Sequence, residues 1–108
     1  MSNVMTWVRV ATTAAVPLGE MLGVSVNGFK LAIYHLDDDS FRATQNVCTH
    51  EFALLSDGWL EGSEVECPLH AGRFDVRTGR ALCEPLKRDI AVFAVEVRDG
   101  EIFVALPQ

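Results

Sequence analysis

With 108 residues, the chain is long enough for one domain with a buried core, and a hydrophobic content of 49% excludes a disordered protein. Its formal net charge of −6 disfavours binding to phosphate backbones, so we expect no nucleic-acid partner. Three cysteines are too few for a disulfide scaffold, and the sequence shows no signal peptide and no membrane-length apolar run, which predicts a cytoplasmic protein with no membrane contact.

The first part of the chain is dominated by short strands. One helical turn is expected within Val16–Leu22. Residues 24–26 and 29–34 then flank Asn27-Gly28, a dipeptide that favours a two-residue hairpin turn. A short strand from Phe41 to Thr44 follows an acidic turn.

Residues 47–72 break this rhythm. They predict two loops that rise from a β scaffold, with a short strand pair around Trp59-Leu60 and Val65-Glu66 between them. A second hairpin is expected after the loops, with strands at 90–98 and 101–106 around Asp99-Gly100. Short strands with regular turn signals predict an all-β fold, an antiparallel sandwich or partly open barrel, in a single domain over residues 1–108.

The loop region carries four candidate metal ligands. Cys48-Thr49-His50 is followed, after sixteen residues, by Cys67-Pro68-Leu69-His70, so each arm offers one thiolate and one imidazole. Both donor types suit zinc or an iron–sulfur cluster. A zinc finger usually pairs its cysteines in one arm, whereas one type of [2Fe-2S] cluster places two Cys on one iron and two His on the other. The mixed arms therefore favour one such cluster held by Cys48, His50, Cys67 and His70.

The surrounding residues extend this pattern. The runs 56–62, 66–70 and 72–76, with Thr78-Gly79, resemble the Rieske ferredoxins of bacterial ring-hydroxylating dioxygenases, of the naphthalene dioxygenase kind. The resemblance implies the Rieske fold, with a two-loop cluster-binding subdomain at about residues 46–85. It implies a one-electron carrier that is not itself an enzyme. Its partners would be a flavin-containing NAD(P)H reductase, which gives electrons, and a terminal oxygenase, which receives them for hydroxylation of an aromatic ring.

The resemblance implies one further loop, and the sequence departs from it at one position. A third, proline-rich loop is expected at 83–86, and Glu51 follows His50 where such ferredoxins commonly carry Gly. High-potential Rieske proteins share the motif but brace their loops with a disulfide at the places held here by Ala53 and Leu69.

Those high-potential proteins also donate hydroxyl hydrogen bonds to the cluster sulfurs from the places held here by Gly72 and Phe74. Neither residue has a side-chain donor, and loss of such donors makes reduction harder. The sequence therefore predicts a reduction potential at the low end of the Rieske range.

Two other functions remain open at this point. The chain could be the Rieske subunit of a larger enzyme such as an assimilatory nitrite reductase, or a structural zinc-binding interaction module. It has no dinucleotide-binding glycine fingerprint and is too short to add a mononuclear iron domain, so it is not expected to be the oxygenase.

The sequence also predicts the surroundings of several side chains outside the ligand set. Cys83 is expected to be a small buried hydrophobe, His35 a surface histidine, and Trp59 either a support for the loops or a core residue. The segment 51–66 has five acidic and no basic residues, which indicates either a docking patch or a solvated face. Basic residues instead gather at 73–88.

Overall fold

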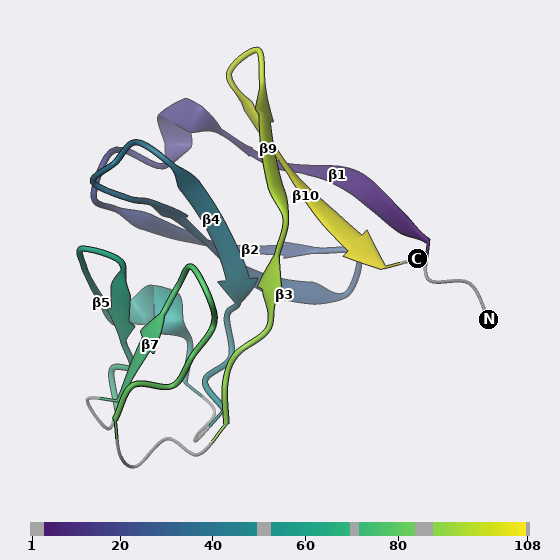
Figure 1. Ribbon diagram of the computed structural model, residues 1–108. Coiled ribbons are helices and arrows are strands. Elements are labelled where there is room, and N and C mark those ends of the chain that lie inside the picture. Colours follow the sequence, from purple (N-terminus) through teal and green to yellow (C-terminus); the bar gives the residue numbers. More distant parts are fainter. Residues whose placement is uncertain (1–3, 50–52, 70–71, 84–87, 108) are drawn as a thin grey trace.

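The computed structural model describes residues 4–49, 53–69, 72–83 and 88–107 (Figure 1). Within these residues the chain forms three antiparallel sheets. The first has the order β1-β10-β9, with strands Met5–Thr12, Glu101–Pro107 and Val95–Arg98. The second has the order β2-β3-β4-β8, with strands Met21–Val26, Phe29–His35, Phe41–Gln45 and Val92–Phe93. The third has the order β5-β6-β7, with strands Trp59–Glu61, Glu64–Glu66 and Arg73–Asp75.

The first two sheets pack face to face around one hydrophobic core. Side chains that alternate along β3 and β10 point between the sheets. The buried members of this core are Ala11, Val16, Leu31, Ile33, Ala43, Ile102, Val104 and Leu106. The all-β antiparallel fold expected from the sequence is therefore confirmed.

Both dipeptide turns are present. Asn27 and Gly28 have φ angles of 50° and 82° between β2 and β3, and Asp99 and Gly100 have 50° and 78° between β9 and β10. Positive φ at both central residues defines the type I′ turn, which matches the twist of the flanking strands.

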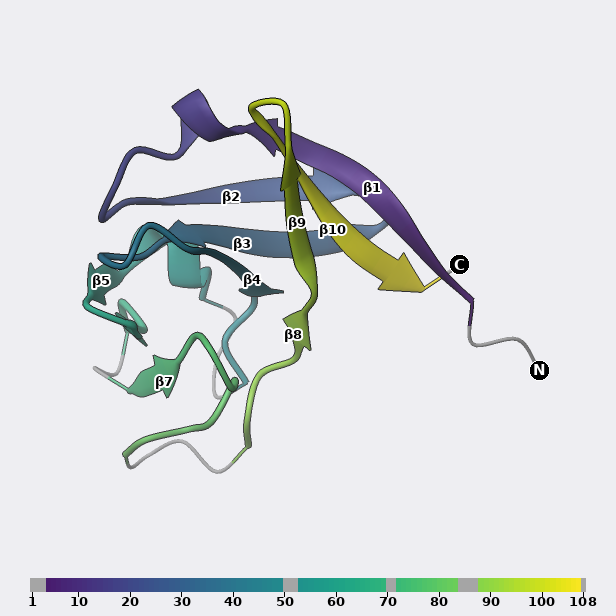
Figure 2. The same ribbon diagram turned by 45° about the horizontal axis from the view of Figure 1, so that its top comes forward.

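The strand expected over residues 90–98 is wrong as a single element. β8 pairs with β4 in the second sheet, whereas β9 pairs with β10 in the first (Figure 2). The chain changes sheet at Ala94, whose carbonyl accepts a hydrogen bond from Ala105 N–H at 3.0 Å. The alternating pattern continues across the change because both parts face the core, so the break is invisible in the sequence.

The helical turn expected within Val16–Leu22 is also wrong. The short 3-10 helix η1 lies at Thr13–Ala15, and β2 begins at Met21. Gly19 N–H donates to His35 O, and His35 N–H donates to Glu20 O, at 2.8 and 3.0 Å. These bonds extend the β2–β3 pairing backwards, so this stretch cannot curl into a helix. Strand β1, before it, was not predicted.

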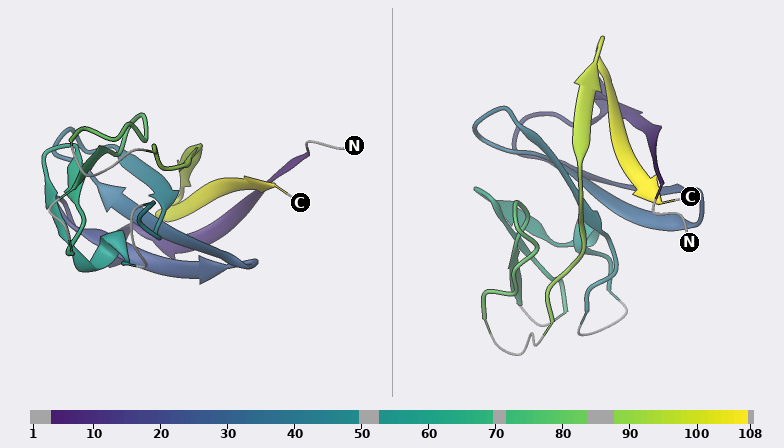
Figure 3. Two further views of the ribbon diagram at one scale, coloured as in Figure 1. Left: turned by 90° about the horizontal axis from the view of Figure 1, so that it is seen from below. Right: turned by 45° about the vertical axis from the view of Figure 1, so that its right-hand side comes forward.

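The third sheet lies against the second at the end of the molecule away from the paired strand ends Met5 and Pro107 (Figure 3). Its inner face contributes Val65 and Phe74 to a second hydrophobic core, which also contains Tyr34 of β3. No helix in the described part of the chain is long and apolar enough to cross a bilayer.

Candidate metal centre

Two hairpin loops of the same size carry the candidate ligands. In the first, Cys48 N–H donates to Ala53 O at 2.9 Å, and in the second, Cys67 N–H donates to Gly72 O at 2.7 Å. Each bond joins a cysteine to the residue five positions later, so each loop is closed at its ligand cysteine. Matched closures place the two cysteines in equivalent positions on two loops.

Each loop has its own two-stranded stem. The first stem pairs Val47 with Leu54, and η2 (Leu55–Asp57) follows it directly. The second stem is the β6–β7 pair, in which Glu66 lies opposite Arg73. The first loop is therefore closed by one antiparallel bridge and the second by a regular strand pair, and a ligand cysteine follows directly after each.

Both cysteine side chains are buried. Cys48 is 4% exposed and Cys67 is 1% exposed, and both belong to the second hydrophobic core. Two thiols brought into one apolar cluster by two equivalent loops are the donors expected for the inner half of an iron–sulfur centre, because thiolates are soft ligands for iron. The donor set thus fits the cluster. His50, His70 and Glu51 lie outside the described residues.

The expectation that Cys83 is buried is wrong, because the structure places it at the surface. The residue before it, Leu82, is paired with the third sheet, because its N–H donates to Arg73 O at 2.9 Å. Cys83 itself belongs to neither hydrophobic core. Most of the expected third loop, residues 84–87, lies outside the described part of the chain.

The flanks of this third segment are nevertheless fixed. Ala81 N–H donates to Asp89 Oδ1 at 2.8 Å, which joins the two sides of the segment. Thr49 Oγ1 donates to Arg88 O at 2.8 Å, and Arg88 Nη2 donates to Thr49 O at 3.5 Å. The first ligand loop is therefore tied to the chain that follows residues 84–87.

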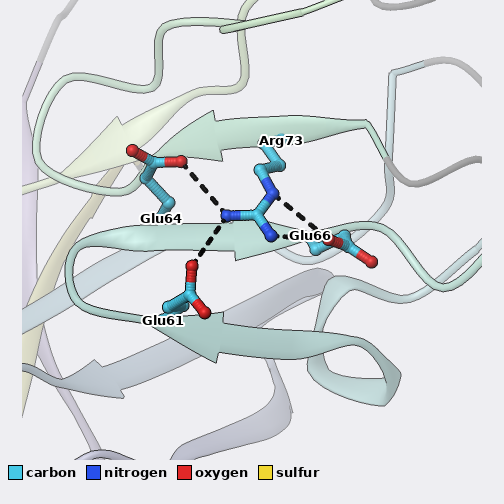
Figure 4. Close-up of polar contacts among 4 residues, drawn as sticks. All are labelled: Glu61, Glu64, Glu66 and Arg73. Atoms are coloured by element: carbon cyan, nitrogen blue, oxygen red, sulfur yellow. Dashed lines mark hydrogen bonds and ion pairs between the residues drawn. The ribbon is translucent and has the colours of Figure 1, made fainter.

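Arg73 gathers three carboxylates on the outer face of the third sheet (Figure 4). Its Nη1 lies 3.1 Å from Glu61 Oε1 and 3.5 Å from Glu64 Oε1, and its Nη2 lies 2.9 Å from Glu66 Oε1. The hydrogen bonds with Glu61 and then Glu66 raise the pKa of the Arg73 guanidinium. The acidic and basic segments, separate in the sequence, thus meet across β5, β6 and β7.

Two other expectations are corrected. The His35 side chain is only 12% exposed, with Nε2 2.6 Å from Asp39 Oδ1, Nδ1 2.9 Å from Val16 O, and its ring stacked on Phe41. Trp59 is 59% exposed, so it is not a core residue. It shares the outer face of the third sheet with Glu66, its cross-strand partner.

The sequence did not single out Gln45, Asn46 or Thr49, which hold the first ligand loop and its stem. Arg88 lies 39 positions from Thr49 and Ala91 lies 46 from Gln45, whereas Ser56 lies only 10 from Asn46. The nearest signal is a pair of adjacent amide side chains just before the first ligand cysteine.

Comparisons with known proteins agree with this geometry. The model of the Rieske [2Fe-2S] domain matches residues 6–103. The chain is 45% identical over 100 residues to the ferredoxin component of naphthalene 1,2-dioxygenase/salicylate 5-hydroxylase systems from Ralstonia sp., covering 93% of this chain and 95% of that protein. The ferredoxin of Sphingomonas yanoikuyae B1 matches with a TM-score of 0.89 and 35% identity, covering 94% and 100% of the two chains. A chain from a complex of reduced oxygenase and oxidised ferredoxin in carbazole 1,9a-dioxygenase matches with a TM-score of 0.86 and 40% identity, covering 92% of both.

Proposed function

The chain belongs to the Rieske [2Fe-2S] family, and on that basis we propose that Cys48, His50, Cys67 and His70 hold its single cluster. When bound, the cluster takes up and releases one electron. The two cysteines would bind the buried iron, and the two histidines the iron nearer the surface. We assign the cluster-binding subdomain to about residues 46–85 of one domain.

The function is one-electron transfer within an aromatic-ring dioxygenase system. A flavin-containing NAD(P)H reductase supplies the electron, and a terminal oxygenase receives it. Two relatives that are 45% identical over 100 residues carry the name of ferredoxin components, so the chain is an electron-transfer component and not the catalyst. We place it in the cytoplasm, where NAD(P)H is available to the reductase.

One observation supports the ligand assignment more than any other. Cys48 and Cys67 are buried in the same apolar core and close two loops of equal size. Buried thiols elsewhere in proteins are usually packing residues, with no reason to begin matched loops. The equal closures at both cysteines support a single site with one ligand loop on each side.

The two alternative functions are less well supported. Family membership and the ferredoxin relatives do not favour a structural zinc module. A fixed subunit of a larger reductase requires an extensive apolar interface. The outer face of the third sheet instead carries Glu61, Glu64, Glu66 and Arg73, which suits a transient contact.

Reconstitution tests this function. The protein is mixed with NADH, a purified flavin-dependent ferredoxin reductase, a terminal ring-hydroxylating oxygenase and naphthalene. We expect product to form only when the protein is present, and Cys67→Ser to give no more product than its omission. A protein that is reduced by the reductase but is never reoxidised by oxygenases of this class would contradict the assigned partner.

A further inference from the structure

We propose that Gln45 and Asn46 are positioning residues that clamp the first ligand stem from opposite sides and thereby hold Cys48 in place. The proposal rests on the function proposed above and adds two residues to its site. Each acts through the backbone that leads into Cys48.

Gln45 joins the stem to the chain that returns from the third loop. Its Oε1 accepts Ala91 N–H at 2.8 Å, and its backbone N–H donates to Ala91 O at 2.9 Å. Its Nε2 donates to Val47 O at 2.8 Å, one residue before Cys48. The side chain therefore bridges Val47 and Ala91, which belong to segments far apart in the sequence.

Asn46 holds the other side of the stem. Its Oδ1 accepts Ser56 N–H and its Nδ2 donates to Ser56 Oγ, both at 2.9 Å, while its backbone carbonyl accepts Leu55 N–H at 2.7 Å. Asn46 is one of two buried polar residues in the described chain. Gly23 of β2 leaves the room that it needs, because a Cβ at Gly23 would lie 2.9 Å from Asn46 Nδ2.

Only an amide can make these contacts. Gln45 accepts the Ala91 N–H and donates to Val47 O, whereas Asn46 accepts the N–H of Ser56 and donates to the hydroxyl of the same residue. Among uncharged side chains, a planar amide offers an acceptor and a donor at fixed separation. At the end of β4, the Gln45 amide thus satisfies the N–H of Ala91 and the Asn46 amide satisfies the N–H of Ser56. The stem therefore keeps its position although β4 ends at Gln45, three residues before Cys48.

The clamp should control how firmly the first loop holds its ligand. If the stem shifts, water gains access to the inner thiolate side of the site. Solvent favours the form with the extra negative charge, which is the reduced form, so the reduction potential rises. The rate of iron loss rises as well.

The test uses Gln45→Met, with Lys30→Met as the matched control because Lys30 is exposed on the neighbouring strand β3. Bleaching of the visible spectrum in excess chelator and the midpoint potential are measured for both. We expect Gln45→Met to bleach on the order of tenfold faster and to have a higher potential, as loss of two hydrogen bonds of ordinary strength allows. Equal rates and potentials in the two variants would overturn the proposal.

A second variant separates the two side-chain hydrogen bonds of Gln45, and hydrogen exchange gives it a readout that does not depend on the cluster. Gln45→Glu keeps an acceptor for Ala91 N–H but loses the donor to Val47 O. We expect hydrogen exchange of the Ala91 amide to stay slow in Gln45→Glu and to accelerate in Gln45→Met, while bleaching accelerates in both. An exchange rate of the Ala91 amide that is the same in Gln45→Met as in the wild type would refute the clamp. A wild-type protein with no Rieske signal but with the expected exchange pattern would refute the proposed function alone.

Discussion

The three cysteines differ at the level of single residues. Cys48 and Cys67 are buried in one apolar core, whereas Cys83 is exposed. Serine is a poor substitute for a thiolate ligand of iron. We expect Cys48→Ser and Cys67→Ser to lose the Rieske visible spectrum and Cys83→Ser to keep it. An unchanged spectrum in Cys67→Ser would contradict the ligand assignment.

Tyr34 offers a second test at this scale because it is the one tyrosine in the sequence. Its hydroxyl lies 3.0 Å from Thr44 Oγ1, and since the Thr44 hydroxyl donates to Gln45 O, Tyr34 is the donor of this pair. Burial raises the pKa of the phenol well above its ordinary value, because the charged phenolate would lose its hydration in the core.

A raised pKa stabilises the fold below the ordinary value of about 10, and this stabilisation is lost as the pH rises above it, because only the unfolded chain ionises there. We therefore expect tyrosinate absorbance to be absent near pH 10 and to appear only together with unfolding. Circular dichroism recorded in the same titration shows the unfolding. Smooth ionisation near pH 10 in a folded protein would contradict the burial. Tyr34→Phe should give no such absorbance.

At the scale of elements, the second ligand stem depends on the close approach of η2 to β6. A Cβ added at Gly58, which follows η2, would collide with the backbone carbonyl of Glu66, next to Cys67. Gly62, in the β5–β6 turn, has a φ of 58° but open space around it. The two glycines thus separate a steric role from a conformational one.

We expect Gly58→Ala to displace Glu66 and to lower cluster content markedly. Gly62→Ala should keep the cluster and cost about 1–2 kcal/mol of stability through its left-handed φ alone. Iron content per chain and thermal unfolding of the purified variants measure the two effects. Equal cluster content in both variants would show that the approach of Gly58 to β6 is not needed.

Elements with a local signal were predictable from the sequence, and those set by distant partners were not. The Asn27-Gly28 and Asp99-Gly100 turns follow from the backbone preferences of adjacent residues. The split at Ala94 does not, because the choice of sheet depends on pairing with β4 and β10.

The same distinction holds at the site. The ligand cysteines stand out through their spacing to histidine, and both prove to be buried. The contacts of Gln45 with Ala91 and of Arg73 with Glu61 join residues that only the folded sheets bring together. Short polar side chains with remote partners leave no periodic trace in a sequence.

At the scale of the whole molecule, the outer face of the third sheet decides how partners approach. Three carboxylates surround one guanidinium there, which leaves a charge of −2. Such a charge near a redox site attracts a basic partner over the screening length of ~8 Å at physiological ionic strength.

Variants of opposite charge test this attraction. Glu61→Gln with Glu64→Gln should slow electron transfer from the reductase or to the oxygenase at low salt, and Arg73→Gln should speed it with the same partner. Both differences should vanish at high salt. If the stopped-flow rates change in the same direction for both variants, or do not depend on salt concentration, the outer face of the third sheet has no role in attracting partners.

The reduction potential is a property of the whole cluster environment. Phe74 is fully buried in the core that holds Cys48 and Cys67, and Gly72 contributes its carbonyl to the second loop closure. Neither supplies a side-chain hydroxyl to the cluster, so we expect a midpoint reduction potential at the low end of the Rieske range, about −150 mV. Voltammetry should show an upward shift in a Gly72→Ser, Phe74→Tyr variant, and a clearly positive wild-type value would contradict this electrostatic account.

Pulsed electron paramagnetic resonance of the dithionite-reduced protein tests the ligand set itself, because it detects the nitrogen atoms bound to a paramagnetic cluster. Ligation by Cys48, His50, Cys67 and His70 predicts two strongly coupled nitrogens, and one fewer in a His70→Cys variant that keeps a cluster. A wild-type spectrum without coupled nitrogens would contradict ligation by the two histidines. A purified protein that contains zinc and gives no paramagnetic signal would contradict the cluster itself.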